Sequence, residues 1–301
     1  MAARRFKPLL DAVVGSAAVG LIQAFRRLDR KRTANVAGAL TRKIGPLIKE
    51  HRLGRENLRA AFPEKSNAEI EAILAGVWDN LGRVTVEFAH LDEFSVQGFG
   101  TPTRDVVTYD PDSLARYHRI AKAEKGAIIF AAHLANWELP GLAAKLSGLK
   151  SAVLFRRPNN DAIADAIVKL RTPLMGELVP TTFDAPVKLA RMLEDGIHVG
   201  MLADQHYVRG VEVTFFGRTC LANPLAALLA RRTECPIHGI RLVRRPDGNT
   251  FWGEFTEAIT PTRDAGGNID IQPTMQTVTS MIESWVREHP EQWLWLHRRW
   301  R

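Results

Sequence analysis

The sequence predicts an α/β fold in which a sheet with parallel strands is flanked by helices and preceded by a helical amino-terminal region. From about residue 126 onward, short apolar runs that end in a polar residue alternate with helix-length stretches, and this alternation is typical of parallel sheets. Between residues 34 and 92 the apolar side chains instead follow a helical period. A chain of 301 residues with 46% hydrophobic residues is long enough to bury a sizeable core.

The amino-terminal segment, residues 9–25, reads LLDAVVGSAAVGLIQAF and has basic residues on both sides. A helix that spans a bilayer needs roughly 17–25 apolar residues, so this segment is at the short end, and it contains Asp11 and Gln23. The alternatives are a signal peptide, for which no clear cleavage site is present, and a buried helix. We expect residues 1–33 to form a membrane-associated helix, spanning or interfacial, and residues 34–301 to form the main domain.

The remaining elements follow from local patterns. The start of a helix over residues 69–90 is signalled by Ser66 and Asn67, with Glu69 following. Because chemistry in parallel sheets gathers where strands end, the strand-end residues His133 and Asp204 are the first candidates for a site. Strands are expected over residues 126–133, 151–156, 198–204, 236–244 and 250–259, and helices over residues 161–170, 185–194, 224–232 and 274–288.

The charge of the chain favours acidic partners. Lys and Arg total 41 against 33 acidic residues, which gives a formal net charge of +8. Such a balance suits nucleic acid, anionic lipid, phosphorylated substrates or an acidic carrier protein. The two cysteines, Cys220 and Cys235, do not form a C-x-x-C pair, so the sequence offers neither a zinc knuckle nor a redox motif.

The segment His133-Leu-Ala-Asn136-Trp137-Glu138 combines a strand-end histidine with a carboxylate five residues later. Imidazole is suited to taking a proton near neutral pH, and a carboxylate on its other ring nitrogen fixes the tautomer. We therefore predict a hydrogen bond between His133 and Glu138 across a strand–turn–helix boundary, with Asn136 capping the helix. No G-x-S-x-G elbow is present, so the hydroxyl that the histidine activates is expected to belong to the substrate. An isolated spacing of this kind is more often a core histidine beside a surface glutamate, so other motifs must support it.

The motif HLANWE resembles the H-x-x-N-W-E signature of the bacterial lipid A late acyltransferases, which belong to the wider glycerophosphate-acyltransferase-like group. Further landmarks follow in the order of that family over roughly residues 60–301. The sequence CLANP, which comes after Phe215-Phe216-Gly217, does not match the family pattern. The landmarks are Arg156 with Asn159, Arg171 ahead of Gly176, Asp204-Gln205 followed by Phe215-Phe216-Gly217, and the tail PEQWLWLHRRW at residues 290–300.

The resemblance implies a glycerophosphate-acyltransferase-like fold, with a mixed or parallel sheet flanked by helices, and an acyltransferase domain over residues 34–301. It implies an O-acyltransferase that moves a fatty acyl chain from acyl carrier protein to a hydroxyl of a lipid A precursor at the cytoplasmic face of the bacterial inner membrane. His133 is then the general base and Glu138 the residue that orients it. No metal and no organic cofactor is implied.

The resemblance also implies substrate-binding and acyl-pocket residues, and each has an alternative. Arg171 is expected to grip a phosphate with its guanidinium fork, or else to be a solvated helix residue. Asp204 and Gln205 are expected to position the acceptor or support the histidine, or else to cap a turn. Phe215 and Phe216 either line an acyl slot or pack in the core. The expected substrate-binding residues are Asn136, Arg156, Arg171, Asp204, Gln205, Arg298 and Arg299, and the expected acyl-pocket residues are Trp137, Phe215 and Phe216.

Two other functions fit parts of the pattern. An acyltransferase of the same fold that uses acyl-CoA and acts on another glycolipid or phospholipid has nearly the same sequence features. A non-catalytic basic protein that binds membranes or nucleic acid would use the charge and the aromatic, basic tail. The ordered chemical motifs favour the enzyme, and no nucleic acid partner is expected.

Overall fold

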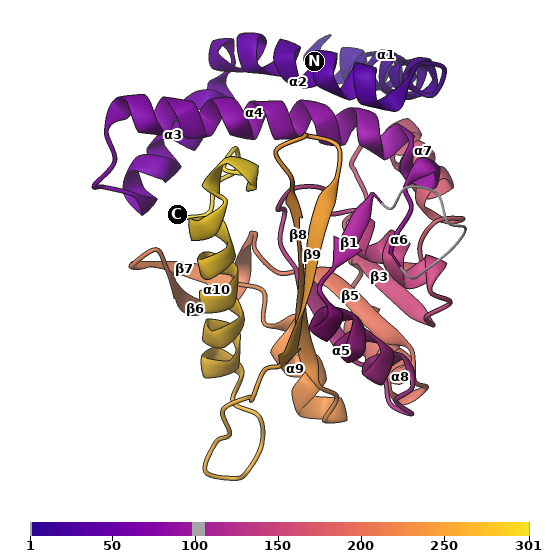
Figure 1. Cartoon of the computed structure of the whole chain (residues 1–301), viewed down its shortest axis with the longest axis vertical. Coiled ribbons are helices and arrows are strands. Elements are labelled where there is room, and N and C mark those ends of the chain that lie inside the picture. Colours follow the sequence, from indigo (N-terminus) through magenta and orange to yellow (C-terminus); the bar gives the residue numbers. More distant parts are fainter. Residues whose placement is uncertain (1, 98–105, 301) are drawn as a thin grey trace.

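The computed structural model describes residues 2–97 and 106–300, with side chains from residue 14 onward. It shows the predicted mixed α/β architecture (Figure 1). The strands are β1 (Val107–Tyr109), β2 (Ile128–Ala131), β3 (Ser151–Phe155), β4 (Glu177–Pro180), β5 (His198–Leu202), β6 (His206–Phe215), β7 (Arg218–Ala222), β8 (Ile237–Arg244) and β9 (Phe251–Ala258). The helices are α1 (Ala2–Phe25), α2 (Arg30–Ile44), α3 (Lys49–Ala61), α4 (Asn67–Ala89), α5 (Pro111–Ala121), α6 (Leu139–Leu146), α7 (Asp161–Arg171), α8 (Ala185–Glu194), α9 (Leu225–Thr233) and α10 (Ile271–Glu288), with short 3-10 turns η1 (Gly45–Leu47), η2 (Leu91–Glu93) and η3 (Pro290–Gln292).

Seven strands form one sheet in the order β1-β9-β8-β2-β5-β3-β4. The five strands from β8 to β4 are parallel to one another, whereas β9 runs antiparallel to β8 and carries β1 beside it. The prediction of a mixed or parallel sheet flanked by helices is therefore confirmed, and the sheet is mostly parallel, with two strands of opposite direction at one side. Strands β6 and β7 form a separate antiparallel hairpin beside α10.

The two faces of the sheet are covered differently. Helices α8, α9 and α10 pack on one face and enclose a continuous core that includes Phe130, Met275 and Trp285. Helices α5 and α6 lie over the other face. Side chains of successive strand residues point to opposite faces, so Phe130 enters the core while its neighbours Ile129 and Ala131 face α5 and α6.

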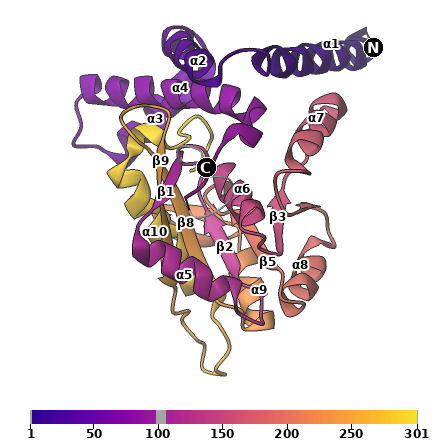
Figure 2. The same cartoon turned by 45° about the vertical axis from the view of Figure 1, so that its right-hand side comes forward.

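The amino-terminal helices form a layer across the carboxyl edge of the sheet (Figures 1 and 2). Helix α4 starts with a capping box between Ser66 and Glu69, as the start signals of the sequence indicate. It packs closely against α2 because glycines stand at the contact: a Cβ on Gly82 would lie 2.6 Å from the Ala37 carbonyl oxygen. Helix α1 instead reaches sideways over α7. Among the described residues, the structure has no helix that is long and apolar enough to cross a bilayer.

Candidate active site

His133 and Asp204 meet at the carboxyl ends of two neighbouring strands. β2 and β5 are parallel partners, and the pairing continues past both strands because Ala203 N–H donates to the Ala131 carbonyl oxygen at 2.9 Å. The Nδ1 atom of His133 is 2.8 Å from Oδ1 of Asp204. The backbone N–H of His133 donates to Oδ2 of the same carboxylate, also at 2.8 Å. The strand ends thus bring together two residues that are 71 positions apart.

The partners of the imidazole determine which nitrogen is free to act. An ionised carboxylate only accepts hydrogen bonds, so Nδ1 must carry the proton that it shares with Asp204. The other nitrogen, Nε2, then holds a lone pair, and the Gln205 side-chain amide lies 3.3 Å from it. The His133 side chain is 14% exposed, whereas the Asp204 side chain is fully buried. His133 is therefore oriented as a base whose accepting nitrogen faces the accessible side.

The carboxylate that holds His133 is not the predicted one. Both oxygens of Glu138 are bound by the guanidinium fork of Arg171, with Nε of Arg171 at 2.9 Å from Oε2. The predicted hydrogen bond between His133 and Glu138 is therefore wrong. The ring of His133 is bound to Asp204, and the carboxylate of Glu138 is bound to Arg171. The ion pair with Glu138 also occupies the guanidinium of Arg171, which was expected to bind a phosphate.

A buried polar network that the sequence reading missed fixes the loop between β2 and α6. The Asn136 side chain donates to Glu87 at 2.9 Å and accepts from the Glu138 N–H at 3.1 Å. Arg244 binds both oxygens of Glu87, and Asn80 donates to the carbonyl of Ala135 at 3.0 Å. Two polar signals were available, since Asn80 and Glu87 lie seven residues apart among the apolar residues of one helix.

The carboxyl-terminal tail closes the site from the other side. Trp293 donates its indole N–H to Oδ2 of Asp204 at 2.7 Å, and Leu134 pairs with Trp293 in an isolated bridge. The backbone N–H of Leu294 also donates to the carbonyl of His133 at 3.1 Å. The aromatic tail therefore holds the loop of His133 and the Asp204 carboxylate in place.

Charge and burial set the protonation of this cluster. Burial alone would raise the pKa of the Asp204 carboxyl, but the charge of His133 and the hydrogen bonds from His133 outweigh it and hold that pKa below its usual value. Burial lowers the pKa of the neighbouring His297 to about 4, against the opposing attraction of Asp204. Asp204 is therefore ionised and His297 neutral near pH 7.

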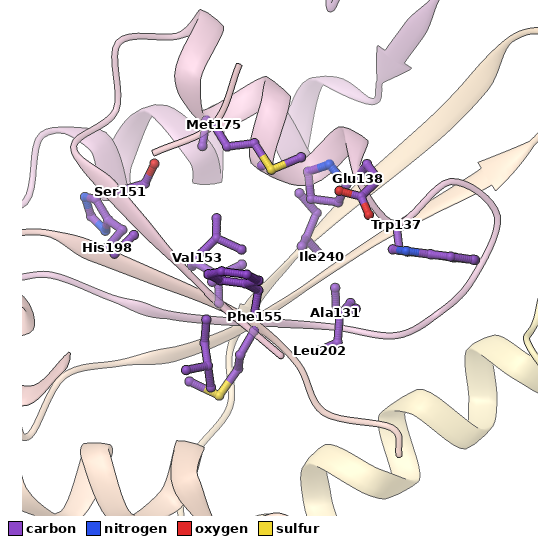
Figure 3. Close-up of a pocket in the computed structure, with 18 of the residues that line it drawn as sticks. Ala131, Trp137, Glu138, Ser151, Val153, Phe155, Met175, His198, Leu202 and Ile240 are labelled. Atoms are coloured by element: carbon purple, nitrogen blue, oxygen red, sulfur yellow. The ribbon is translucent and has the colours of Figure 1, made fainter. Parts of the chain in front are cut away.

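An apolar cavity of about 410 Å³ opens beside His133, within the range of roughly 300–1,000 Å³ that ligand pockets show. It lies on the face of the sheet that α5 and α6 cover. In Figure 3, Trp137 and Glu138 stand at one end and Ser151 and His198, the first residues of β3 and β5, at the other. The wall between them is built largely from Ile129, Ala131, Val153, Phe155, Met175, Gly200, Ile240 and Phe255.

A second, polar cleft of about 570 Å³ lies on the other side of Gln205. Arg156 and Gln205 line both the cavity and this cleft, so the two spaces adjoin where the accessible nitrogen of His133 lies. The remaining lining residues of the cleft are His206, Tyr207, Val208, Arg209, His297 and Arg298.

The structure brings only some of the expected site residues to these two spaces. Trp137, Arg156, Arg171, Gln205 and Arg298 line one or both of them.

The other expected residues lie elsewhere. Phe215 and Phe216 are buried in a cluster with Trp293 and Trp295, so core packing, the alternative reading, applies to them. Arg299 is 1% exposed and donates to a backbone carbonyl, and it therefore cannot reach a substrate. Asn136 is fully buried and acts on the loop rather than on a ligand.

The whole chain is similar to known bacterial enzymes. The family profile described as bacterial lipid A biosynthesis acyltransferase matches residues 4–301. The lipid A biosynthesis palmitoleoyltransferase of Escherichia coli (strain K12) is 24% identical over 266 residues, which cover 87% of this chain and 81% of that protein. The lipid A biosynthesis acyltransferase of Shigella flexneri matches with the same identity and coverage. The profile covers nearly the full chain, whereas the identity to these relatives is low.

Proposed function

The chain belongs to the bacterial lipid A biosynthesis acyltransferase family, and on that premise we propose that it transfers a fatty acyl chain from acyl carrier protein to a hydroxyl of a lipid A precursor. One observation carries the proposal. The Nε2 atom of His133 lies where an apolar cavity and a basic cleft adjoin, while Asp204 holds the opposite ring nitrogen.

The chemistry follows from this placement. Nε2 of His133 takes the proton of the acceptor hydroxyl, and the oxygen forms a bond to the carbonyl carbon of the acyl thioester. The resulting tetrahedral intermediate loses the thiolate as the carbon–sulfur bond breaks, and His133 returns its proton to the sulfur. Asp204 stabilises the imidazolium in between without itself becoming protonated.

The two adjoining spaces divide the substrates between them. An acyl chain gains about 0.8 kcal/mol for each methylene that leaves water, so the apolar cavity suits the hydrocarbon of the donor. The cleft is lined by Arg156, Arg209 and Arg298, so it suits the phosphorylated sugar of the acceptor. Their junction places a thioester and a hydroxyl together at His133.

Glu138 and Arg171 act as a pair in this proposal. Both line the cavity next to His133, and Glu138 is 6% exposed. Glu138 fixes the guanidinium of Arg171 at the mouth of the cavity, where its positive charge stabilises the oxyanion of the tetrahedral intermediate. Glu138 thus contributes to catalysis through Arg171 rather than through the histidine.

The amino-terminal layer is the proposed contact with the cytoplasmic face of the bacterial inner membrane. Exposed apolar side chains follow one another along α2 and η1 at Val36, Leu40, Ile44 and Leu47, the spacing of one helix face. Exposed basic residues, Lys31, Arg32, Lys43 and Lys49, lie among them. Apolar and basic side chains together favour an anionic bilayer surface, so residues 1–33 and α2 are proposed as an interfacial anchor.

A transfer assay tests this function. The full chain is incubated with a lipid A precursor and either acyl-carrier-protein thioester or acyl-CoA, and the mass of the product is measured by mass spectrometry. We expect transfer from the carrier-protein donor, and a loss of about 10²–10⁴-fold in rate for His133→Ala. His118→Ala, which alters an exposed histidine of α5, is the control. Full activity of His133→Ala would exclude the general-base role, and exclusive use of acyl-CoA would exclude the carrier-protein donor.

A further inference from the structure

Three arginines gather around the basic cleft, and no acidic residue lines it with them. Arg156, Arg209 and Arg298 line the cleft and are exposed, and none of their guanidinium groups makes a hydrogen bond or ion pair with another residue that the structure describes. Many guanidinium groups in the described chain are matched to carboxylates, as in the pairs of Arg241 with Glu254 and Arg263 with Glu234. Three unmatched cations around one cleft without an acidic lining residue repel one another, so an anion there would relieve the repulsion.

The backbone places one of these arginines in the cleft by an irregularity of the hairpin. The pairing of β6 with β7 shifts between His206 and Val211, both of which face Ala222. The residues in between bulge out of the hairpin and carry Tyr207 and Arg209 to the cleft. The bulge requires Gly210, because a Cβ there would lie 2.3 Å from the carbonyl oxygen of Ala222. Bulges beside active sites commonly redirect a side chain in this way.

We propose that Arg156, Arg209 and Arg298 form a binding site for a phosphate ester carried by the substrate that meets His133. This proposal rests on the proposed function and extends it, since it assigns the phosphate contact to the bulge and tail arginines instead of Arg171 and Arg299. The three come from different segments: the end of β3, the β6 bulge and the tail.

The chemistry of the cleft fits this ligand. A guanidinium makes two parallel hydrogen bonds to phosphate oxygens and stays charged at every physiological pH. The cleft is concave and has room for one such group beside Gln205. Two sources supply the same chemistry, the sugar phosphate of the acceptor and the phosphodiester of the donor's prosthetic arm. The acyl chain of the donor occupies the cavity on the far side of His133, so the acceptor is the source that the geometry favours.

Steady-state kinetics of Arg209→Ala against both substrates test the site. A hydrogen bond between charged groups contributes enough that its loss should raise the KM for the phosphorylated acceptor about ten-fold or more, while kcat and the KM for the donor stay near those of the wild type. Arg232→Ala on α9 removes the same charge from an exposed position outside both spaces, and it controls for the general loss of attraction. Arg209→Lys should recover part of the loss, because lysine keeps the charge without the fork.

Each result decides between the sources or against the site. An acceptor that lacks its sugar phosphate is then compared between the wild type and Arg209→Ala. If the substitution causes no further rise in the KM for this acceptor, the two changes remove one interaction and the acceptor phosphate is the ligand. A rise confined to the donor KM assigns the same site to the donor's phosphodiester. A KM for both substrates equal to that of Arg232→Ala, or a change in kcat alone, would overturn the proposal.

A binding measurement keeps the site testable apart from catalysis. Inorganic pyrophosphate is titrated into the full chain by calorimetry, with Arg209→Ala and Arg232→Ala alongside. The expected result is binding that weakens with Arg209→Ala alone and decreases as salt is raised. A wild-type chain that binds pyrophosphate but transfers no acyl group would contradict the proposed function and leave the anion site standing, whereas equal binding by all three proteins would remove the site.

Discussion

The cavity and the cleft that adjoin at His133 differ in almost every physical respect. The cavity is walled by strands of the sheet and by α6, so its shape is set by regular secondary structure. The cleft is formed by a strand end, a bulge and the tail, and its lining side chains are largely charged or polar. A wall of apolar strand residues limits the size of the ligand that the cavity can bind. A set of arginines on irregular segments recognises charge.

On the proposed function, this difference would allow one histidine to serve two unlike substrates. His133 takes its orientation from neither space but from Asp204, Trp293 and the loop network behind it. Changes on the cavity side should therefore alter the choice of acyl chain, changes on the cleft side should alter the acceptor, and changes behind the histidine should affect both equally.

Asp204→Asn should give the largest effect, and it should not distinguish the two substrates. The amide would donate to Nδ1 of His133 and force the proton onto Nε2, which then cannot accept one. We expect kcat to decrease about 10²–10⁴-fold at every pH, with both KM values little changed. Glu138→Gln is the comparison, because it removes the negative charge beside Arg171 and does not alter the groups that hold the ring of His133. A loss with Asp204→Asn that disappears at high pH would contradict the tautomer argument.

His297 makes the cleft side sensitive to acid in a way that the cavity is not. Its pKa is lowered from 6.5 to about 4 by burial, and partly restored by Asp204, while His133 and Arg299 lower it further. The unfolded chain binds this proton near pH 6.5 and the folded chain does not, so the stabilisation is complete above pH 6.5 and is lost as the pH falls towards 4.

A shift of this size corresponds to about 3 kcal/mol. Between pH 7 and pH 4 the free energy of unfolding should therefore decrease in the wild type and less in His297→Gln. The difference between the two decreases should be about this amount. Urea denaturation at several pH values measures both. Parallel pH profiles for the two proteins would show that another group is responsible.

Gly200→Val should change the cavity alone. Gly200 lines the cavity from β5, and a Cβ there would meet no atom closer than 3.8 Å, so the valine fits the strand and its methyl groups enter the empty space. All five residues of β3 line the cavity, so the length of this strand indicates the length of the cavity. At about 3.3 Å per residue they span roughly 16 Å, the length of an extended acyl chain of about twelve carbons.

The variant should therefore lose about ten-fold in kcat/KM with the longest accepted donor, since two methylenes leave the cavity. Short donors serve as the internal control. Competition among acyl carriers of several lengths provides the measurement, and an unchanged length profile would place the acyl chain elsewhere.

The smallest effect is expected at the membrane face. Leu40→Ser on α2, which is 54% exposed, should weaken binding to anionic vesicles about five-fold, because one leucine leaves the interface. Leu228→Ser on α9 is matched in size and exposure at 43% and lies away from the α2 layer (Figure 1). Co-sedimentation of the two variants with vesicles compares them, and equal binding would show that α2 does not touch lipid.

The sequence by itself determined the local structure closely. The predicted helix over residues 185–194 coincides with α8, and the predicted strand over residues 151–156 differs from β3 by one residue. These elements have strong apolar periods and clear ends. The strands β1, β4, β6 and β7 were not predicted. β1 and β4 have only three and four residues and no longer apolar run around them, and β6 and β7 form a separate hairpin that a bulge interrupts. The position of His133 at a strand end was also determined locally, by the apolar run before it.

Only the tertiary structure decided which groups meet His133. The sequence favoured Glu138 because it is five residues away, but α6 begins directly after Glu138 and Arg171 of α7 takes its carboxylate. Asp204 reaches the ring because β2 and β5 are neighbours in the sheet, and no local pattern states the order of strands. The unpaired arginines of the cleft depend equally on tertiary structure, since a free guanidinium and a paired one look identical in a sequence. Spacing along the chain predicts contacts only within an element, whereas contacts between elements follow from the order in which the sheet assembles.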